Sequence, residues 1–472
     1  MQIDEEYFNN DEFRENLKSY EESVKSGHPI FLDADDLTDI IDYYSMQHND
    51  ALAESTADHA LTLFPDAPGP ITYKGRRCLD QDDIEGAEEL VERLSNDDID
   101  YKFIKAEIFL AQGKSAEAER MLYAALDAAD YDDYDNCILD ATNLFVDYKY
   151  YEKAESWLNK IEETDNDDYV ELKVKICSWF GEIEEAEELL NKIIDRNPYQ
   201  HKYWNMLSSA QLMNNKTAEA LTSSEYSLAV TPDNPEGLIC KAQVLAKMYQ
   251  YDQAIIYYLK YLDIYNKDSS GYVQLATCFM SLGKNQEALI ACKMAERFAE
   301  GDNELLGSIY ENMALAYSHL HDETNAMACL KKLGNRFSVH QIDLMKAYIY
   351  LECGNKENGF VTLLDMLEHC DFDSAYVLKA SVALFENEME EAAYDVMRKF
   401  FPLDDDDMEY GHAYFALYCY NLGKDEEFLK YLKIATERNP EEAELTMHHI
   451  FPEGMKPSDY YNYIKNNNNN HT

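Results

Sequence analysis

The sequence predicts an all-α protein made of about twelve stacked antiparallel helix pairs. Two sets of mostly small side chains repeat with a period of about 34 residues, and the composition seldom interrupts helices. The 472 residues include only 17 glycines and 11 prolines, and 46% are hydrophobic, so the chain has ample material for burial. The length exceeds one ordinary core, and no Pro-, Ser- or Gly-rich linker divides it, which favours one repeat array.

The first repeating set is a small residue followed four positions later by an apolar one. Successive members lie 31 to 38 residues apart, with a mean of about 34. The set consists of Ala53, Ala87, Ala118, Ala154, Ala186, Ala220, Ala254, Ala288, Ala326, Gly359, Ala392 and, less well, Phe428. Side chains four residues apart share one face of a helix, so each member marks the packing face of a helix that we call helix B.

The second set lies twelve residues before the first and marks an earlier helix, helix A. It consists of Ile41, Gly75, Ala106, Thr142, Val174, Ser208, Ala242, Ala276, Ala314, Ala347, Ala380 and Ala416. Small side chains on both helices let the two backbones approach, while larger residues one turn away fill the flanks. Glycines that follow several A helices, such as Gly113 and Gly283, fit the left-handed cap that ends many helices.

This pattern resembles the tetratricopeptide repeat family. The best copy runs from His201 to about Pro232 and has Trp204, Leu207, Ser208, Ala220 and Pro232 at the signature places of the family. The resemblance covers roughly Ala34 to Pro440. It implies a right-handed superhelical solenoid whose concave groove is lined by the A helices and binds other proteins.

Repeat arrays need polar caps at both ends, because each helix pair buries too little by itself. We therefore expect an N-terminal capping helix within residues 1–33, the repeat array over 34–440 and C-terminal capping helices within 441–465. Residues 466–472 form an Asn-rich tail that we expect to be disordered.

The net charge of −51 disfavours nucleic acid and anionic membranes as partners, because both would be repelled. No basic segment followed by an apolar stretch opens the chain, and no apolar run is long enough to span a bilayer. The ten cysteines are scattered without a Cys-x-x-Cys pair, which is typical of a reducing compartment. We expect a cytoplasmic protein.

The groove positions of the first five repeats are mostly acidic. They hold Asp35, Asp42, Asp80, Asp100, Glu107, Asp147, Asp168 and Glu171, opposed by Arg76 and Lys175. This half of the groove is expected to attract a basic segment of a protein partner.

The equivalent positions of the last four repeats are apolar or aromatic. They hold Leu315, Leu344, Tyr348, Leu351, Val377, Leu384, Phe385, Leu417 and Tyr420. Such a strip would accept an amphipathic helix or an extended apolar peptide. The alternative is that a one-position error in the register places these residues in the packing between repeats, so that replacing Tyr348 and Phe385 with Asp would unfold the chain.

The middle repeats carry isolated polar groups. Lys202, Asn205 and Lys247 could form a small patch that grips a carboxylate, although a lone lysine on a helix is usually solvated. No spacing of Cys, His or carboxylate groups is typical of a metal site. No nucleophile motif or Gly-rich phosphate loop is present, so we expect no metal, no cofactor and no catalytic residue.

Together these features predict a non-catalytic scaffold or adaptor that binds a partner segment along its groove. A second hypothesis is an acidic, holdase-like chaperone or nucleic-acid mimic that shields a basic protein. Moderate salt separates the two, since binding by charge alone is screened while apolar binding survives. An enzyme is the least favoured class.

Overall fold

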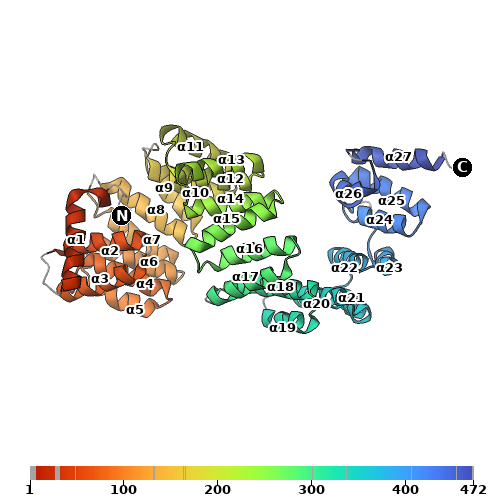
Figure 1. Ribbon diagram of the computed structural model, residues 1–472. Coiled ribbons are helices and arrows are strands. Elements are labelled where there is room, and N and C mark those ends of the chain that lie inside the picture. The colour runs from red at the N-terminus through yellow and green to blue at the C-terminus, as the bar shows by residue number, and fades with distance from the viewer. Residues whose placement is uncertain are drawn as a thin grey trace. The chain divides into compact units, whose positions relative to one another are not determined.

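The computed structural model describes residues 7–26, 32–47, 49–130, 133–162, 164, 166–299, 301–334, 337–405, 407–452 and 454–469. Every regular element in these ranges is a helix (Figure 1). The chain divides into two compact units, Met1–Thr231 and Pro232–Thr472, and each holds six helix pairs within the described ranges. The expectation of about twelve antiparallel pairs is confirmed.

The first unit begins with a short 3-10 helix, η1 (Tyr7–Asn9), and α1 (Asp11–Ser26). Six pairs follow: α2 (Ala34–Met46) with α3 (Asp50–Leu63), α4 (Pro68–Asp80) with α5 (Ile84–Val91), α6 (Ile99–Ala111) with α7 (Ser115–Leu126), α8 (Tyr134–Asp147) with α9 (Tyr151–Leu158), α10 (Asp167–Phe180) with α11 (Ile183–Arg196), and α12 (His201–Met213) with α13 (Thr217–Val230). The first helix of each pair is helix A. Neighbouring A helices contact each other, as α2 does α4 and α4 does α6.

The second unit also has six pairs, followed by a helical end. The pairs are α14 (Pro235–Lys247) with α15 (Tyr251–Ile264), α16 (Ser269–Ser281) with α17 (Asn285–Phe298), α18 (Asn303–His319) with α19 (Glu323–Leu333), α20 (Val339–Glu352) with α21 (Lys356–His369), α22 (Ser374–Glu386) with α23 (Glu390–Phe400), and α24 (His412–Asn421) with α25 (Asp425–Arg438). The helical end consists of α26 (Pro440–Met447), η3 (His448–Ile450) and α27 (Pro457–Asn469).

Helix α27 extends further than the sequence suggested. Residues 466–469 belong to it, although we expected them to be disordered, and 470–472 lie outside the described residues. The helix is held by Tyr460, which is 1% exposed and stacks on Phe451 with ring centroids 3.7 Å apart. This anchor lets the helix continue into the asparagine run.

The two small sets are buried where the helices of each pair meet. Eleven members of the first set and all twelve of the second are buried. In the best copy the Ser208 hydroxyl donates a hydrogen bond to the Ala220 carbonyl at 2.8 Å, which joins the two sets directly. The exception is Ala392, which is only partly buried, because Ala393 takes the packing position in α23.

Most of the tight turns inside the pairs have a left-handed residue, and several of these residues are glycines, as expected. Gly113 and Gly283 have φ of 74° and 69°. Lys149 and Tyr249 adopt φ of 63° and 60° at the same place in other pairs, a conformation that is costly for residues with a side chain. No helix among the described residues is long and apolar enough to cross a bilayer.

Candidate functional site

Arg76 on α4 is the centre of a charged network on the A helices of the first unit. Its Nε lies 3.0 Å from Glu107 Oε2 on α6, while the side chain stays 52% exposed. Burial alone would lower the pKa of Arg76, but Glu107, Asp42 and Asp100 raise it through their negative charge. Three A helices therefore bring predicted groove residues together around one cation.

The network continues along α8 and α10. The charges of Lys175 and Arg76 both act on Asp147. Sequence reasoning missed Asp140 on α8. Its negative charge contributes to the raised pKa values of Asp100 on α6 and Asp168 on α10. The strip formed by Asp42, Arg76, Asp100, Glu107, Asp140, Asp147, Asp168, Glu171 and Lys175 is called the acidic face below.

Four carboxylates of the acidic face have raised pKa values. Burial raises the pKa of Asp42 to about 6, and neighbouring Asp39 adds to the rise. The pKa values of Asp100, Asp147 and Asp168 are also raised, in each case chiefly by burial. Asp42 is partly buried, while Asp100, Asp147 and Asp168 are exposed at the surface. A cation placed among these carboxylates would favour their ionised form.

Asp42→Asn is expected to stabilise the protein. Because the folded pKa lies above that of the unfolded chain, the ionised carboxylate opposes folding at pH 7 and the protonated one does not. The free energy of unfolding should rise by about 1–2 kcal/mol at pH 7, a value reduced because Asp42 is only partly buried. This gain should shrink as the pH falls toward 4, because the wild-type carboxylate then becomes protonated.

Urea unfolding at pH 7 and pH 4.5 measures this effect. Asp35→Asn is the matched control, because Asp35 is exposed on the same helix and should give no increase. If Asp42→Asn is no more stable than the wild type at pH 7, the ionised Asp42 carboxylate does not oppose folding.

Two residues of the polar patch predicted for the middle repeats are already paired or buried. Lys202 Nζ lies 2.6 Å from Glu171 Oε1, so this cation already has a carboxylate partner. Asn205 is only 6% exposed. Lys202 and Asn205 belong to the first unit and Lys247 to the second. Lys202 therefore extends the acidic face as a counter-charge.

The apolar strip of the second unit is largely packing surface. Leu351 is 2% exposed, and its Cδ2 would lie 2.6 Å from a Cβ added at Gly359 on the partner helix, so the side chain points into its own pair. Val377, Leu384 and Leu417 are buried in the same core. The placement of Leu351 in the groove is corrected: four residues after Ala347, it lies on the face that meets helix B.

Other members of the strip keep part of their surface. Leu344, Tyr348 and Phe385 are partly buried against that core, and Phe385 packs on Tyr418 with ring centroids 4.8 Å apart. Leu315 is also partly buried, and Tyr420 is 45% exposed. The second unit therefore exposes parts of separate aromatic and aliphatic side chains instead of the continuous apolar strip that we expected.

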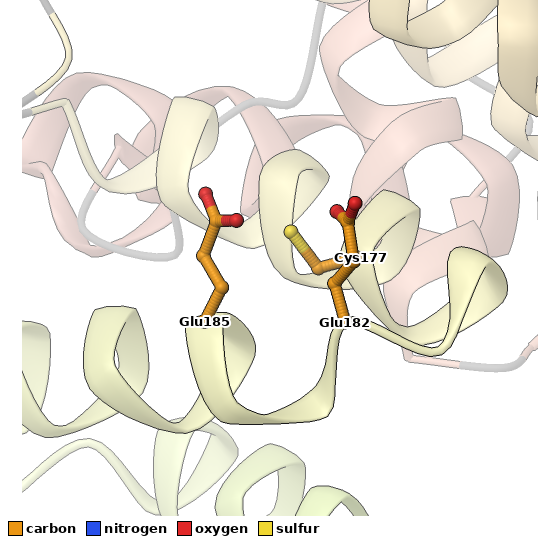
Figure 2. Close-up of side chains that lie close together, drawn as sticks. All are labelled: Cys177, Glu182 and Glu185. Carbon is orange, nitrogen blue, oxygen red and sulfur yellow. The ribbon is translucent and has the colours of Figure 1, made fainter.

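One group of possible metal ligands occurs among the described residues, and sequence reasoning missed it. The ligand atoms of Cys177, Glu182 and Glu185 lie within 4.8 Å of one another, around the turn between α10 and α11 (Figure 2). Burial raises the pKa of the Cys177 thiol to about 11, so at neutral pH the thiol keeps its proton and is a poor ligand. Glu185 also lies 3.9 Å from Lys173 Nζ. The group is better described as a helix-end contact.

Comparison with known proteins gives similarity of fold alone. No protein-family model matches the chain, and no curated protein matches it. Three similar solved structures are MamA from Desulfovibrio magneticus RS-1, YrrB, described as a TPR protein with an unusual peptide-binding site, and the APC/C hetero-tetramer Cut9–Hcn1.

These similarities are remote. Sequence identities are 16% for MamA, 17% for YrrB and 12% for Cut9–Hcn1, with TM-scores of 0.32, 0.33 and 0.37. The matches cover 35%, 41% and 93% of this chain and 90%, 94% and 93% of the other chains. The fold is assigned from the helix pairs themselves. Small residues are buried where the helices of each pair cross, and they recur about every 34 residues. The chain is a tetratricopeptide-like helical repeat protein.

Proposed function

We propose that the protein is a non-catalytic scaffold or adaptor and that the acidic face of its first unit binds a basic segment of a protein partner. The observation that carries this proposal is the raised pKa of several carboxylates along consecutive A helices, among which Arg76, Lys175 and Lys202 are too few to balance the charge. Destabilised charges concentrated on one face are typical of functional sites.

The second unit has a smaller part in this proposal. Its partly exposed edges, at Leu315, Leu344, Tyr348, Phe385 and Tyr420, are available to an amphipathic portion of the same partner. We also propose a cytoplasmic location, which the ten free cysteines support.

A basic peptide is expected to bind the acidic face in a manner that depends on charge position. The probe is a ten-residue peptide of alternating Arg and Lys with blocked ends, titrated calorimetrically into the full chain at low salt. Replacing Asp42, Asp100 and Asp147 together with Asn should weaken binding by about tenfold or more, because three of the seven carboxylates of the acidic face are lost. Binding should also weaken between pH 7 and pH 5.5, since the cation binds ionised Asp42, whose pKa is about 6.

A matched variant separates a site from general attraction. Replacing Glu89, Glu188 and Asp195 with Gln, Gln and Asn changes the net charge equally, but these residues lie on the B helices α5 and α11 and do not belong to the acidic face. This variant should bind almost as the wild type does. Equal weakening by both triple variants would contradict a defined site.

The alternative function is a chaperone or nucleic-acid mimic that shields a basic protein. It predicts the opposite result for the two triple variants. Shielding would use the negative charge of the whole molecule, which totals −51. Both triple variants would then lose affinity equally, and binding would vanish at moderate salt. Only the adaptor hypothesis predicts that the two triple variants differ in affinity.

A further inference from the structure

An exposed pair of stacked aromatic rings lies on two neighbouring repeats of the first unit. Tyr151 begins α9 and Trp179 lies near the end of α10, and their ring centroids are 4.3 Å apart with an interplanar angle of 13°. Trp179 is nevertheless 56% exposed. Trp157 is 0% exposed, and the indole of Trp204 donates to the Pro198 carbonyl, so Trp179 differs from both other tryptophans of the chain.

The pair continues the acidic face. Glu171, Lys175 and Trp179 follow one another at intervals of four residues, which places them along one side of α10. Asp147 ends α8, four residues before Tyr151, and it interacts electrostatically with Lys175. Along the chain, Trp179 therefore follows Lys175 by about one helical turn on α10, and Tyr151 follows Asp147 by four residues.

We propose that Trp179, supported from behind by Tyr151, binds the guanidinium group of an arginine in the basic segment. The open face of an indole attracts a cation through its quadrupole, and the planar, weakly hydrated guanidinium stacks on it better than an ammonium group does. The net negative charge of the acidic face supplies the charge complementarity, and the stacked tyrosine holds the indole in place. This inference rests on the proposed function, because it assumes that the segment lies along the acidic face.

The proposal assigns a side-chain preference to the site. Charge alone attracts arginine and lysine peptides equally, so any preference at equal charge must come from a group that distinguishes their head groups. A single exposed cation–π contact corresponds to about a twofold to fivefold difference in affinity.

The test compares two blocked ten-residue peptides of equal charge, one with arginines and one with lysines at the same positions, by calorimetry on the full chain. The wild type should bind the arginine peptide about twofold to fivefold more tightly. Trp179→Ala should bring the two affinities together, and Trp179→Phe should keep part of the preference. Tyr199→Ala is the matched control, because Tyr199 is 84% exposed in the loop between α11 and α12 and should leave the preference unchanged.

Two results would overturn the inference. If the wild type binds both peptides equally, or if Trp179→Ala keeps the arginine preference, then Trp179 does not recognise the guanidinium group although the acidic face still binds basic peptides. If the wild type binds neither peptide, the proposed function fails as well. Circular dichroism of each variant checks that the helices are intact, and Trp179→Phe provides the comparison should Trp179→Ala lose structure.

Discussion

Replacing Trp157 with alanine is expected to lower the free energy of unfolding by about 3–5 kcal/mol, the largest single loss in the first unit. The side chain is 0% exposed and joins two helix pairs. It packs on Tyr123 from the preceding pair, at 4.7 Å between ring centroids, and on Phe145 of its own pair, at 6.1 Å. Its indole nitrogen donates to Glu119 Oε1 at 3.2 Å. Alanine would leave a cavity and remove this link between repeats.

Urea unfolding followed by circular dichroism measures the loss. Trp179→Ala is the matched control, since it removes the same ring from a 56% exposed position of the same unit and should cost less than about 1 kcal/mol. Because repeat arrays unfold in parts, the loss should appear as an earlier transition that involves only some of the helical signal. Equal losses for the two variants would contradict the burial assigned to Trp157.

Leu351→Asp is expected to cost several kcal/mol and to unfold part of the second unit. The substitution places a carboxylate at a position that is 2% exposed, where apolar neighbours offer it no partner. The same change would be harmless, or harmful only to binding, if Leu351 lined a groove as the sequence suggested. This variant therefore decides between the two interpretations of the apolar strip.

Val339→Asp is the control on the same helix, because Val339 begins α20 and is 71% exposed. Thermal unfolding of the full chain should show a lower midpoint for Leu351→Asp and an almost unchanged one for Val339→Asp. A folded Leu351→Asp variant with wild-type stability would return Leu351 to the candidate binding surface.

The fold could be predicted because the same packing residues recur in every repeat. Ala53, Ala87 and Ala118 are each a weak signal, but their near-constant interval along the whole chain is specific to a helical repeat. The single register error shows the limit of this signal. Ala392 and Ala393 are equally small, so only the packing of α23 distinguishes them, and the structure buries Ala393.

The surface position of the acidic residues could be predicted because charged residues on an A helix seldom enter the core. Asp42, Glu107 and Asp147 were therefore assigned to the exposed side without knowledge of their neighbours. The contacts that give the face its properties come from other repeats: the pairing of Arg76 with Glu107 bridges residues 31 positions apart. No local pattern predicts such a pair.

The apolar half could not be predicted by the same reasoning. An apolar residue on an A helix fits the groove, the partner helix and the next repeat equally well, and periods of three and four residues do not separate these faces. Leu351 and Tyr348 are only three residues apart, yet Leu351 is buried and Tyr348 partly exposed. Trp179 was missed because the sequence does not distinguish an exposed ring from a buried one; its spacing of four from Lys175 was the available signal.

Photo-crosslinking tests the central claim, that the acidic face of the first unit binds a basic segment, most directly. The arginine peptide would carry a benzophenone at its centre, and mass spectrometry would locate the crosslinked residues on the full chain at low salt. We expect crosslinks on α2, α4, α6, α8 and α10, close to Asp42, Glu107 and Asp147, and their loss when Asp42, Asp100 and Asp147 are replaced with Asn. Crosslinks concentrated on the B helices α5 and α11, near Glu89 and Glu188, or spread evenly over both units, would contradict it.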